Sequence, residues 1–171
     1  MKFQKIIIGI GGNIKSNDGS HPVHVAMKAI NYLQNYSIQV TGQSSWYESQ
    51  PIPKSDQPNF FNCIVIANTL LNELDVLETL HKIEHKLGRR RKITNEPRVI
   101  DLDLIDYSNK ILKNNQITIP HPRAHKRRFV MEPLAELDPN WVHPTLKRDV
   151  CTILKKLNNQ NIKIIDKKNL I

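Results

Sequence analysis

The sequence is poor in cysteine and lacks long hydrophobic runs. Its only two cysteines, Cys63 and Cys151, have no paired spacing, which excludes a disulfide framework and a thiolate zinc site. No hydrophobic run approaches the roughly 20 residues that cross a bilayer. The N-terminus lacks the long apolar core and the cleavage site of a secretory signal. These absences predict a cytoplasmic protein without a membrane partner.

Acidic residues are also scarce relative to basic ones. There are 25 Lys and Arg against 16 Asp and Glu, a formal net charge of +9. This excess favours anionic partners such as nucleic acid, acidic lipid or a phosphate ester, and composition alone does not choose among them. Because the chain has 171 residues and no internal repeat or linker, we expect a single domain over residues 1–171.

Hydrophobic patterning predicts the order of the elements in the first two thirds of the chain. Residues 5–10 form a β-branched run that predicts a buried strand, and the glycines that follow predict a tight turn. Ser20 is the expected N-cap of a helix, and Asn72 that of a second helix that stops at Gly88. The expected apolar positions are Val23, Met27, Ile30 and Leu33 on the first helix, and Leu74, Leu77, Leu80, Ile83 and Leu87 on the second.

Further strands are expected over residues 38–47, 60–70 and 98–107. The order is therefore β-α-β-β-α-β, which predicts an α+β, ferredoxin-like core: an antiparallel four-stranded sheet with both helices packed on one face. A C-terminal extension adds an extended segment at 117–119 and helices near 127–137 and 149–157.

Asp101 and Asp103 lie between apolar residues in the strand segment Arg98–Asp106. Because strand side chains alternate, Asp101 and Asp103 share one face, and Leu102 lies on the other. Two carboxylates on one face repel each other unless a cation lies between them, and such hard oxygen ligands suit Mg²⁺ held together with substrate phosphates. A solvated acidic sheet face is the alternative interpretation.

Positive charge is dense on both sides of this strand. The cationic residues nearest to it include Arg89, Arg98, Arg123 and Arg127. Guanidinium groups beside carboxylates that bind metal ions suit phosphoryl transfer, because they stabilise charge on phosphate oxygens. A solvated surface or a nucleic-acid patch is the other interpretation.

Two motifs resemble functional sites but are weak. The glycines in residues 9–13 lack the rest of a dinucleotide or P-loop signature. His81, Glu84 and His85 match the inverted zinc-protease pattern H-x-x-E-H, but no third ligand segment follows. Glu84 lies at the border of the apolar stripe, which suits the edge of a cleft. His143 is expected to be structural or exposed.

The residues in combination resemble a known family. The resemblance spans roughly residues 5–157 and rests on P-R-x-x-D-x-D at 97–103, H-P-R-x-x-x-R-x-F at 121–129, and D-Q-P-N-F-F-N at 56–62. In these segments the chain resembles the bacterial 6-hydroxymethyl-7,8-dihydropterin pyrophosphokinases. The resemblance implies an ATP-dependent diphosphotransferase of folate biosynthesis, which transfers the pyrophosphoryl group of ATP to the pterin and releases AMP.

The resemblance also implies a role for individual residues. It implies that Asp101 and Asp103 hold two Mg²⁺ ions and act in catalysis with Arg89 and Arg98. The residues implied to bind ATP, the co-substrate, are His81, Glu84, Arg89, Arg98, Leu104, Ile117, Thr118, His121 and Arg127. Those implied to bind the pterin are Ser49, Ile52, Phe60, Asn62 and Phe129. The loops at 50–58 and 89–97 are expected to close over both substrates.

The expected partners are these two small molecules and no nucleic acid, and the expected state is a monomer. Two alternatives stay open. One is a palm-type nucleotidyltransferase, which would release pyrophosphate instead of AMP. The other is a basic RNA-binding module of ferredoxin-like fold, which leaves the paired aspartates unexplained.

Overall fold

The computed structural model describes residues 2–90 and 95–166, and the β-α-β-β-α-β order is present in it. The elements are β1 (Gln4–Gly12), α1 (Pro22–Asn35), β2 (Ile38–Gln43), β3 (Tyr47–Ser49), β4 (Phe60–Thr69), α2 (Glu73–Lys86), β5 (Asp101–Tyr107), β6 (Leu112–Lys113), β7 (Thr118–Ile119), the 3-10 turn η1 (Ala124–Lys126), α3 (Arg128–Leu137), α4 (Val150–Leu154) and β8 (Ile162–Ile164).

The main sheet is antiparallel and has the order β5-β1-β4-β3-β8, with β2 also paired to β4. Strands β2 and β3 both run along the same partner strand, so together they fill one position of a four-stranded ferredoxin-like sheet. The predicted fold class is confirmed. Strand β8, which the sequence did not indicate, adds an edge beside β3.

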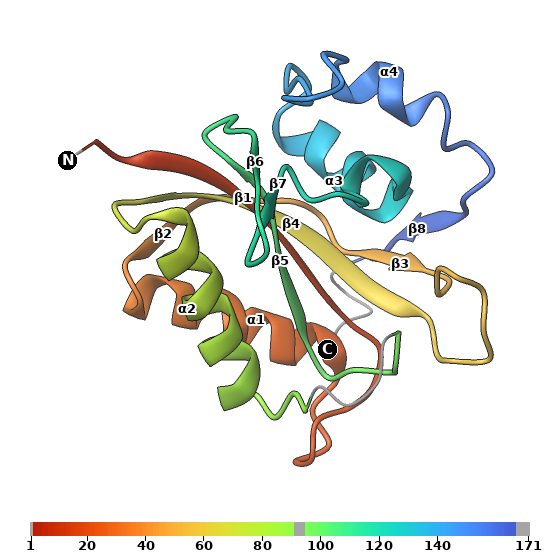
Figure 1. Cartoon of the computed structure of the whole chain (residues 1–171). Helices are drawn as coiled ribbons and strands as arrows, with labels where there is room; N and C mark the ends of the chain where they lie inside the picture. The colour runs from red at the N-terminus through yellow and green to blue at the C-terminus, as the bar shows by residue number, and fades with distance from the viewer. Residues whose placement is uncertain (1, 91–94, 167–171) are drawn as a thin grey trace.

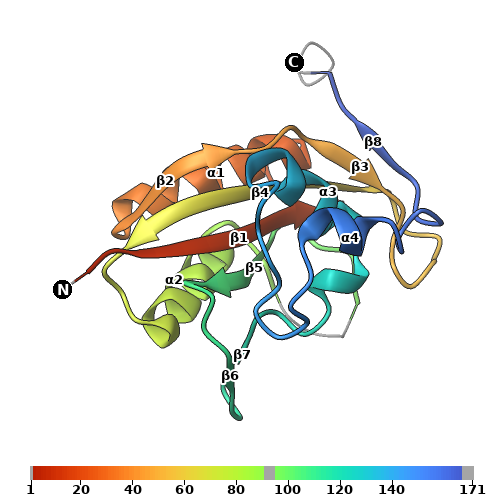
Figure 2. The ribbon, with the colours of Figure 1, turned by 90° about the horizontal axis from the view of Figure 1, so that it is seen from above.

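Helices cover both faces of this sheet (Figure 1). Helices α1 and α2 lie on one face over the larger hydrophobic cluster, which contains Ile8, Leu33, Leu80 and Leu102. Helices α3 and α4 lie on the opposite face over a second cluster, which contains Ile7, Ile64 and Trp141. The turned view in Figure 2 shows this C-terminal part in front of the sheet, nearer to the viewer, with the β6–β7 hairpin projecting away from the sheet.

The expected strand over residues 38–47 is wrong as a single element, because it breaks at Ser44. This buried serine accepts the backbone N–H of Ile64 with its side-chain oxygen at 2.9 Å, where a strand carbonyl would otherwise accept. The pairing of β2 with β4 is also irregular between Val40 and Gly42. A hydroxyl that competes with the ladder is a local event that hydrophobic patterning does not reveal.

The expected caps and helix faces need three corrections. His21, not Ser20, caps α1, because its Nδ1 accepts the N–H of Val23 at 3.3 Å. Met27 is 48% exposed, and Ala26 takes its place against the sheet. Leu74 on α2 is also exposed. Asn72 caps α2 as predicted.

The glycines at the end of β1 serve close packing and not the predicted turn. Both belong to the strand. A Cβ on Gly11 would lie 2.7 Å from Asn62 Oδ1, and one on Gly12 would lie 2.4 Å from the carbonyl oxygen of Val99. The chain can therefore bring β4 and the segment before β5 against β1 only because these side chains are missing. In the described part of the chain, no helix has the length and apolarity needed to span a membrane.

Candidate functional site

Alternation along β5 places the two aspartates on the face that α3 covers. Asp101 and Asp103 pair in register with Gly11 and Gly9 of β1, while Leu102 and Leu104 lie in the core under α1 and α2. Both glycines line the same cavity as the two aspartates. The two carboxylates therefore face a hollow and not a packed core.

Two arginines surround Asp101. The Arg89 guanidinium donates through Nη1 to Asp101 Oδ1 and also to Glu84 Oε1. Arg98 contributes an ion pair from Nε to Asp101 Oδ2 at 3.2 Å. Burial disfavours the charge of Arg89, but the carboxylates of Asp101 and Glu84 outweigh it and hold the Arg89 pKa above its ordinary value. Arg89 is thus a fixed cation at the floor of the site.

Asp103 lies beside a second cationic pair from the segment after β7. His121 Nε2 and Arg127 Nη1 each lie 3.9 Å from Asp103 Oδ2. Burial and the neighbouring Asp101 carboxylate raise the Asp103 pKa to about 6, against the opposing effect of Arg127. Burial, then Arg127 and Arg123, lower the His121 pKa to about 4, so this imidazole is neutral at pH 7.

This arrangement fits a divalent cation that arrives with phosphates. Within residues 2–90 and 95–166, no group of three or more His, Cys, Asp and Glu side chains could hold a metal ion. The two aspartates supply the anionic oxygens of the site, and burial together with their mutual repulsion raises the Asp103 pKa. Mg²⁺ typically takes one or two carboxylates and completes its coordination with water and phosphate oxygens.

An aromatic-lined cavity opens next to the carboxylates. Of the residues expected to bind the pterin, Ile52, Phe60, Asn62 and Phe129 line it, as do both aspartates, Arg98 and Arg127. The Arg98 guanidinium lies 5.2 Å from the centre of the Phe60 ring, and that of Arg127 lies 5.6 Å from the Phe129 ring. The aromatic cavity and the carboxylate site therefore share two arginines.

Ser49 does not line this cavity but positions a residue that does. Its hydroxyl accepts a hydrogen bond from Asn62 Nδ2 at 2.9 Å, and both residues are buried. This bond orients the Asn62 amide toward the cavity floor, beside Gly11. Glycines 9 and 11, which also line the cavity, were not singled out as site residues in the sequence. Alternating glycines on a strand facing a predicted site were the available signal.

Glu84 lies under the site, where it is almost completely buried. It is 2% exposed, and its Oε1 accepts the backbone N–H of Leu102 at 2.7 Å as well as Arg89 Nη1. Its burial depends on Arg89, which comes from the loop after the helix. One carboxylate oxygen therefore ties α2 to the middle of β5 and to a site arginine.

The remaining residues expected to bind ATP lie apart from the cavity. Leu104 and Ile117 belong to the core under α1 and α2, and Thr118 is in the β6–β7 hairpin. His81 lines a separate surface hollow along α2, together with Glu84, Arg89 and Arg90. In this hollow His81 and His85 are exposed and Glu84 is engaged as above, so the H-x-x-E-H pattern forms no metal site in the described chain.

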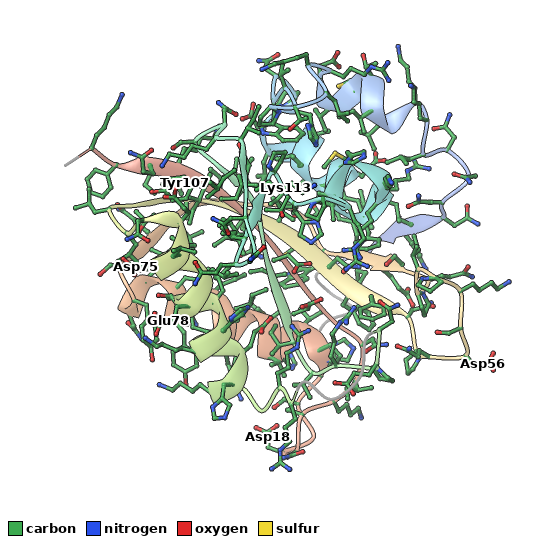
Figure 3. The ribbon with its side chains drawn as sticks, in the orientation of Figure 1. Asp18, Asp56, Asp75, Glu78, Tyr107 and Lys113 are labelled. Atoms are coloured by element: carbon green, nitrogen blue, oxygen red, sulfur yellow. The ribbon has the colours of Figure 1, made fainter. Side chains whose placement is uncertain are left out.

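The two loops expected to close over substrates contact each other. Gln57 Nε2 donates to the carbonyl oxygen of Asn95 at 2.7 Å, and buried Asn13 donates to Gln57 Oε1 at 3.2 Å. Asn13 Oδ1 in turn accepts the N–H of Arg98 at 2.8 Å. Figure 3 shows Asp56 at the tip of the first loop, directed away from the sheet. Residues 91–94 of the second loop lie outside the described residues.

Fold and site together define a class of protein: a ferredoxin-like domain whose sheet presents paired carboxylates, surrounded by arginines, beside an aromatic-lined cavity. Comparison with known proteins narrows this class. Residues 7–139 match the family model described as 7,8-dihydro-6-hydroxymethylpterin-pyrophosphokinase (HPPK). The chain belongs to the HPPK family, which is a family of enzymes.

Individual relatives agree with this assignment. The chain is 38% identical over 137 residues to the 2-amino-4-hydroxy-6-hydroxymethyldihydropteridine pyrophosphokinase of Haemophilus influenzae, covering 80% of this chain and 83% of that one. It is 35% identical to the Bacillus subtilis protein of the same name, covering 76% and 75%. It is 32% identical to the folic acid synthesis protein fol1 of Pneumocystis carinii over 94% of this chain, but spans only 21% of that longer protein.

Solved structures support the fold. The HPPK-DHPS structure of Plasmodium falciparum with STZ-DHP has a TM-score of 0.71 and 14% identity, and it covers 91% of this chain and 43% of that one. The family match and these relatives favour neither the nucleotidyltransferase nor the RNA-binding alternative.

Proposed function

We propose that the chain transfers the pyrophosphoryl group of ATP to 6-hydroxymethyl-7,8-dihydropterin and releases AMP, as a step of folate biosynthesis. The observation that carries the proposal is the shared wall between the carboxylate site and the aromatic cavity. Asp101, Asp103, Arg98 and Arg127 line the same cavity as Phe60. A phosphate donor held at the carboxylate site would face an acceptor held in the aromatic cavity.

The phosphate part of the site needs no covalent nucleophile. Two Mg²⁺ ions held by Asp101 and Asp103 would neutralise charge on the triphosphate. Arg89, Arg98 and Arg127 supply fixed positive charge, and guanidinium groups suit the planar oxygen edges of phosphates. The neutral His121 can donate or accept a hydrogen bond there. These groups position the donor and stabilise charge on the leaving α-phosphate.

The reaction conserves atoms and charge without a further reagent. The acceptor hydroxyl oxygen forms a bond to the β-phosphorus, and its proton is released to solvent. The bond between the β-phosphorus and the α,β-bridging oxygen breaks, and AMP leaves with that oxygen. Because water could attack the same phosphorus, exclusion of water matters. The loops joined through Gln57 and Asn95 are the segments that we propose to close over the substrates.

The acceptor part of the site suits a flat heteroaromatic ring. We propose that Phe60 and Phe129 stack on the two ring faces and that the Asn62 amide hydrogen-bonds the ring edge, with Ile52 over the opening. Ser49 contributes by orienting Asn62. For the adenine we propose the segment around Leu104, Ile117 and Thr118. The Leu104 and Ile117 side chains are buried there, which leaves backbone groups and the half-buried Thr118 side chain for contact.

Product analysis tests the proposal directly. Purified protein with ATP, Mg²⁺ and the hydroxymethylpterin should form AMP in amounts equal to the pterin diphosphate. Asp101→Ala and Asp103→Ala should abolish AMP formation while the circular dichroism spectrum is retained. An exposed carboxylate on α2, Glu78→Ala, is the matched control and should leave AMP formation unchanged. Release of pyrophosphate instead of AMP, or activity without the pterin, would reject the proposal.

A further inference from the structure

The segment that carries His121 and Arg127 has little structure of its own. Between the two residues lies only the single 3-10 turn η1. One such turn is not stable in isolation, so its position must come from packing. Ala124, at 1% exposed, anchors one side of the turn in the cluster on the α3 face of the sheet. The contacts on the other side of η1 therefore affect the positions of His121 and Arg127, the two groups that face Asp103.

A buried histidine from the loop between α3 and α4 contacts the turn. The His143 ring is 3% exposed and meets the His125 ring of η1 edge to face, with centres 5.2 Å apart and planes at 89°. His143 Nδ1 accepts the backbone N–H groups of Thr145 and Leu146, both at 3.2 Å. The hydrogen of the neutral ring is therefore on Nε2. Burial, then His125, lower the His143 pKa to about 4, which keeps the ring neutral at pH 7.

The same loop is attached to the strand that carries the aspartates. Trp141 contacts the His143 ring, with centres 5.6 Å apart, and donates from Nε1 to Asp106 Oδ2 at 3.2 Å. A bulge in the pairing with β1 lies between Leu104 and Asp106, so Asp106 faces the C-terminal part instead of the core under α1 and α2. The bulge thus makes the Asp106–Trp141 bond possible.

The contact between the His143 and His125 rings leaves buried polar atoms without hydrogen bonds. Neither His143 Nε2 nor His125 Nδ1 has a hydrogen-bond partner in the described chain, although both atoms are buried. Each such atom loses its hydrogen bonds to water without replacement, a loss of stability that an apolar side chain would avoid. The histidine adds a planar ring that its Nδ1 hydrogen bonds hold at a defined angle. This ring lies between the η1 segment, which links His121 and Arg127, and Trp141, which is bonded to β5.

We propose that Trp141 and His143 are positioning residues, which set how far the His121–Arg127 segment lies from the aspartates on β5 and thereby set the affinity for the nucleotide's phosphates. The inference rests on the proposed function, because it takes this segment as phosphate-binding. His143 touches no reacting atom and acts through His125, and Trp141 acts through Asp106.

Two substitutions of His143 separate positioning from mere stability. His143→Asn keeps a side-chain acceptor for the two backbone N–H groups but removes the ring. His143→Phe keeps the ring and loses the acceptor. We expect His143→Asn to raise KM for MgATP about tenfold, equivalent to roughly 1.4 kcal/mol, with KM for the pterin within about twofold of wild type. His143→Phe should restore most of the MgATP affinity at a lower melting temperature.

Val142→Ala is the matched control, since this neighbouring side chain is 45% exposed. It should leave both KM values and the melting temperature unchanged. An unchanged KM for MgATP in His143→Asn, or equal rises for both substrates, would overturn the inference. Wild-type AMP formation is measured first, so absence of AMP there rejects the proposed function, whereas AMP formation with an unaffected variant rejects only the positioning role.

A measurement on the unmodified protein covers the case in which His143→Asn does not fold. Trp141 and Trp46 are the two tryptophans, and Trp46 lies in the other hydrophobic cluster, under α1 and α2. Adding Mg²⁺ with a nonhydrolysable ATP analogue should move the Trp141 indole N–H resonance and leave that of Trp46 in place. A stationary Trp141 signal at saturating analogue would contradict the coupling.

Discussion

Glu84→Gln offers the sharpest test of how the site is built. The carboxylate of Glu84 is 2% exposed and joins two partners through one oxygen, the Leu102 N–H and the Arg89 guanidinium. Glutamine has the same size and can still accept the Leu102 N–H, so the substitution creates no cavity. What it removes is the negative charge that Arg89 faces in the buried floor of the site.

The expected loss follows from the partners that remain. Breaking a buried ion pair costs about 3–5 kcal/mol when the other ion is left alone. Arg89 keeps Asp101, so we expect the smaller value for a hydrogen bond to a charged group, about 2–3 kcal/mol. For a domain of this size each kcal/mol lowers Tm by about 2–4 °C, which predicts a fall of roughly 4–12 °C.

Function should change as well as stability. Without the Glu84 charge, Arg89 keeps Asp101 as its carboxylate partner, and Asp101 is one of the two carboxylates proposed to bind Mg²⁺. We therefore expect a weaker apparent affinity for Mg²⁺ in the AMP-forming reaction, measured by titrating Mg²⁺ at fixed ATP. Thermal unfolding followed by circular dichroism measures the stability.

Glu78→Gln is the matched control, because it makes the same chemical change on the same helix. Glu78 is 65% exposed, pairs with Lys82 at 2.8 Å, and points away from the sheet in Figure 3. It should leave both Tm and the Mg²⁺ dependence close to wild type. If Glu84→Gln lowers Tm no more than Glu78→Gln, the carboxylate does not organise the floor of the site and the reasoning fails.

Three further predictions concern packing, recognition and pH. Gly12→Ala should destabilise the fold by about 1–3 kcal/mol in a thermal melt, because its Cβ would lie 2.4 Å from the Val99 carbonyl oxygen. Gly42→Ala is the control and should not destabilise the fold, because the nearest atom to its Cβ would be 3.7 Å away. Equal effects of the two substitutions would contradict the packing argument. Phe60→Leu should weaken pterin binding by about 1 kcal/mol in a fluorescence titration, whereas unchanged affinity would exclude stacking on that ring. Folding lowers the His143 pKa from 6.5 to about 4, so the unfolded chain binds more protons than the folded chain between these pH values. The free energy of unfolding should therefore fall as pH falls from 7 to 4, by up to roughly 3 kcal/mol from this residue. A His143→Asn variant with the same pH slope in denaturant titrations would refute this.

Periodic features of the fold were predictable from the sequence. The alternation of Asp101, Leu102 and Asp103 placed the carboxylates on one face of β5, and the structure has them there. Asn72 and Gly88 marked the limits of α2, because a cap acceptor and a positive φ, +91° at Gly88, are local requirements. Such signals are readable because they depend on residues close in sequence.

Features that depend on distant partners were not predictable. The burial of Glu84 requires Arg89 and the strand that follows, and the break at Ser44 requires the N–H of Ile64 twenty residues later. The buried state of His143 depends on a turn that carries His125. In each case a polar group is satisfied or oriented by a segment that no local pattern connects to it.

Because side chains of β5 alternate between two faces, the effects of substitutions along this strand should alternate with a period of two residues in a saturation mutagenesis experiment. Substitutions at 102 and 104 would lower the amount of protein that accumulates, since both side chains are packed under α1 and α2. Substitutions at 101 and 103 would spare accumulation and abolish growth that depends on the enzyme. At the bulge this alternation should break, so that 105 and 106 behave alike as abundance positions.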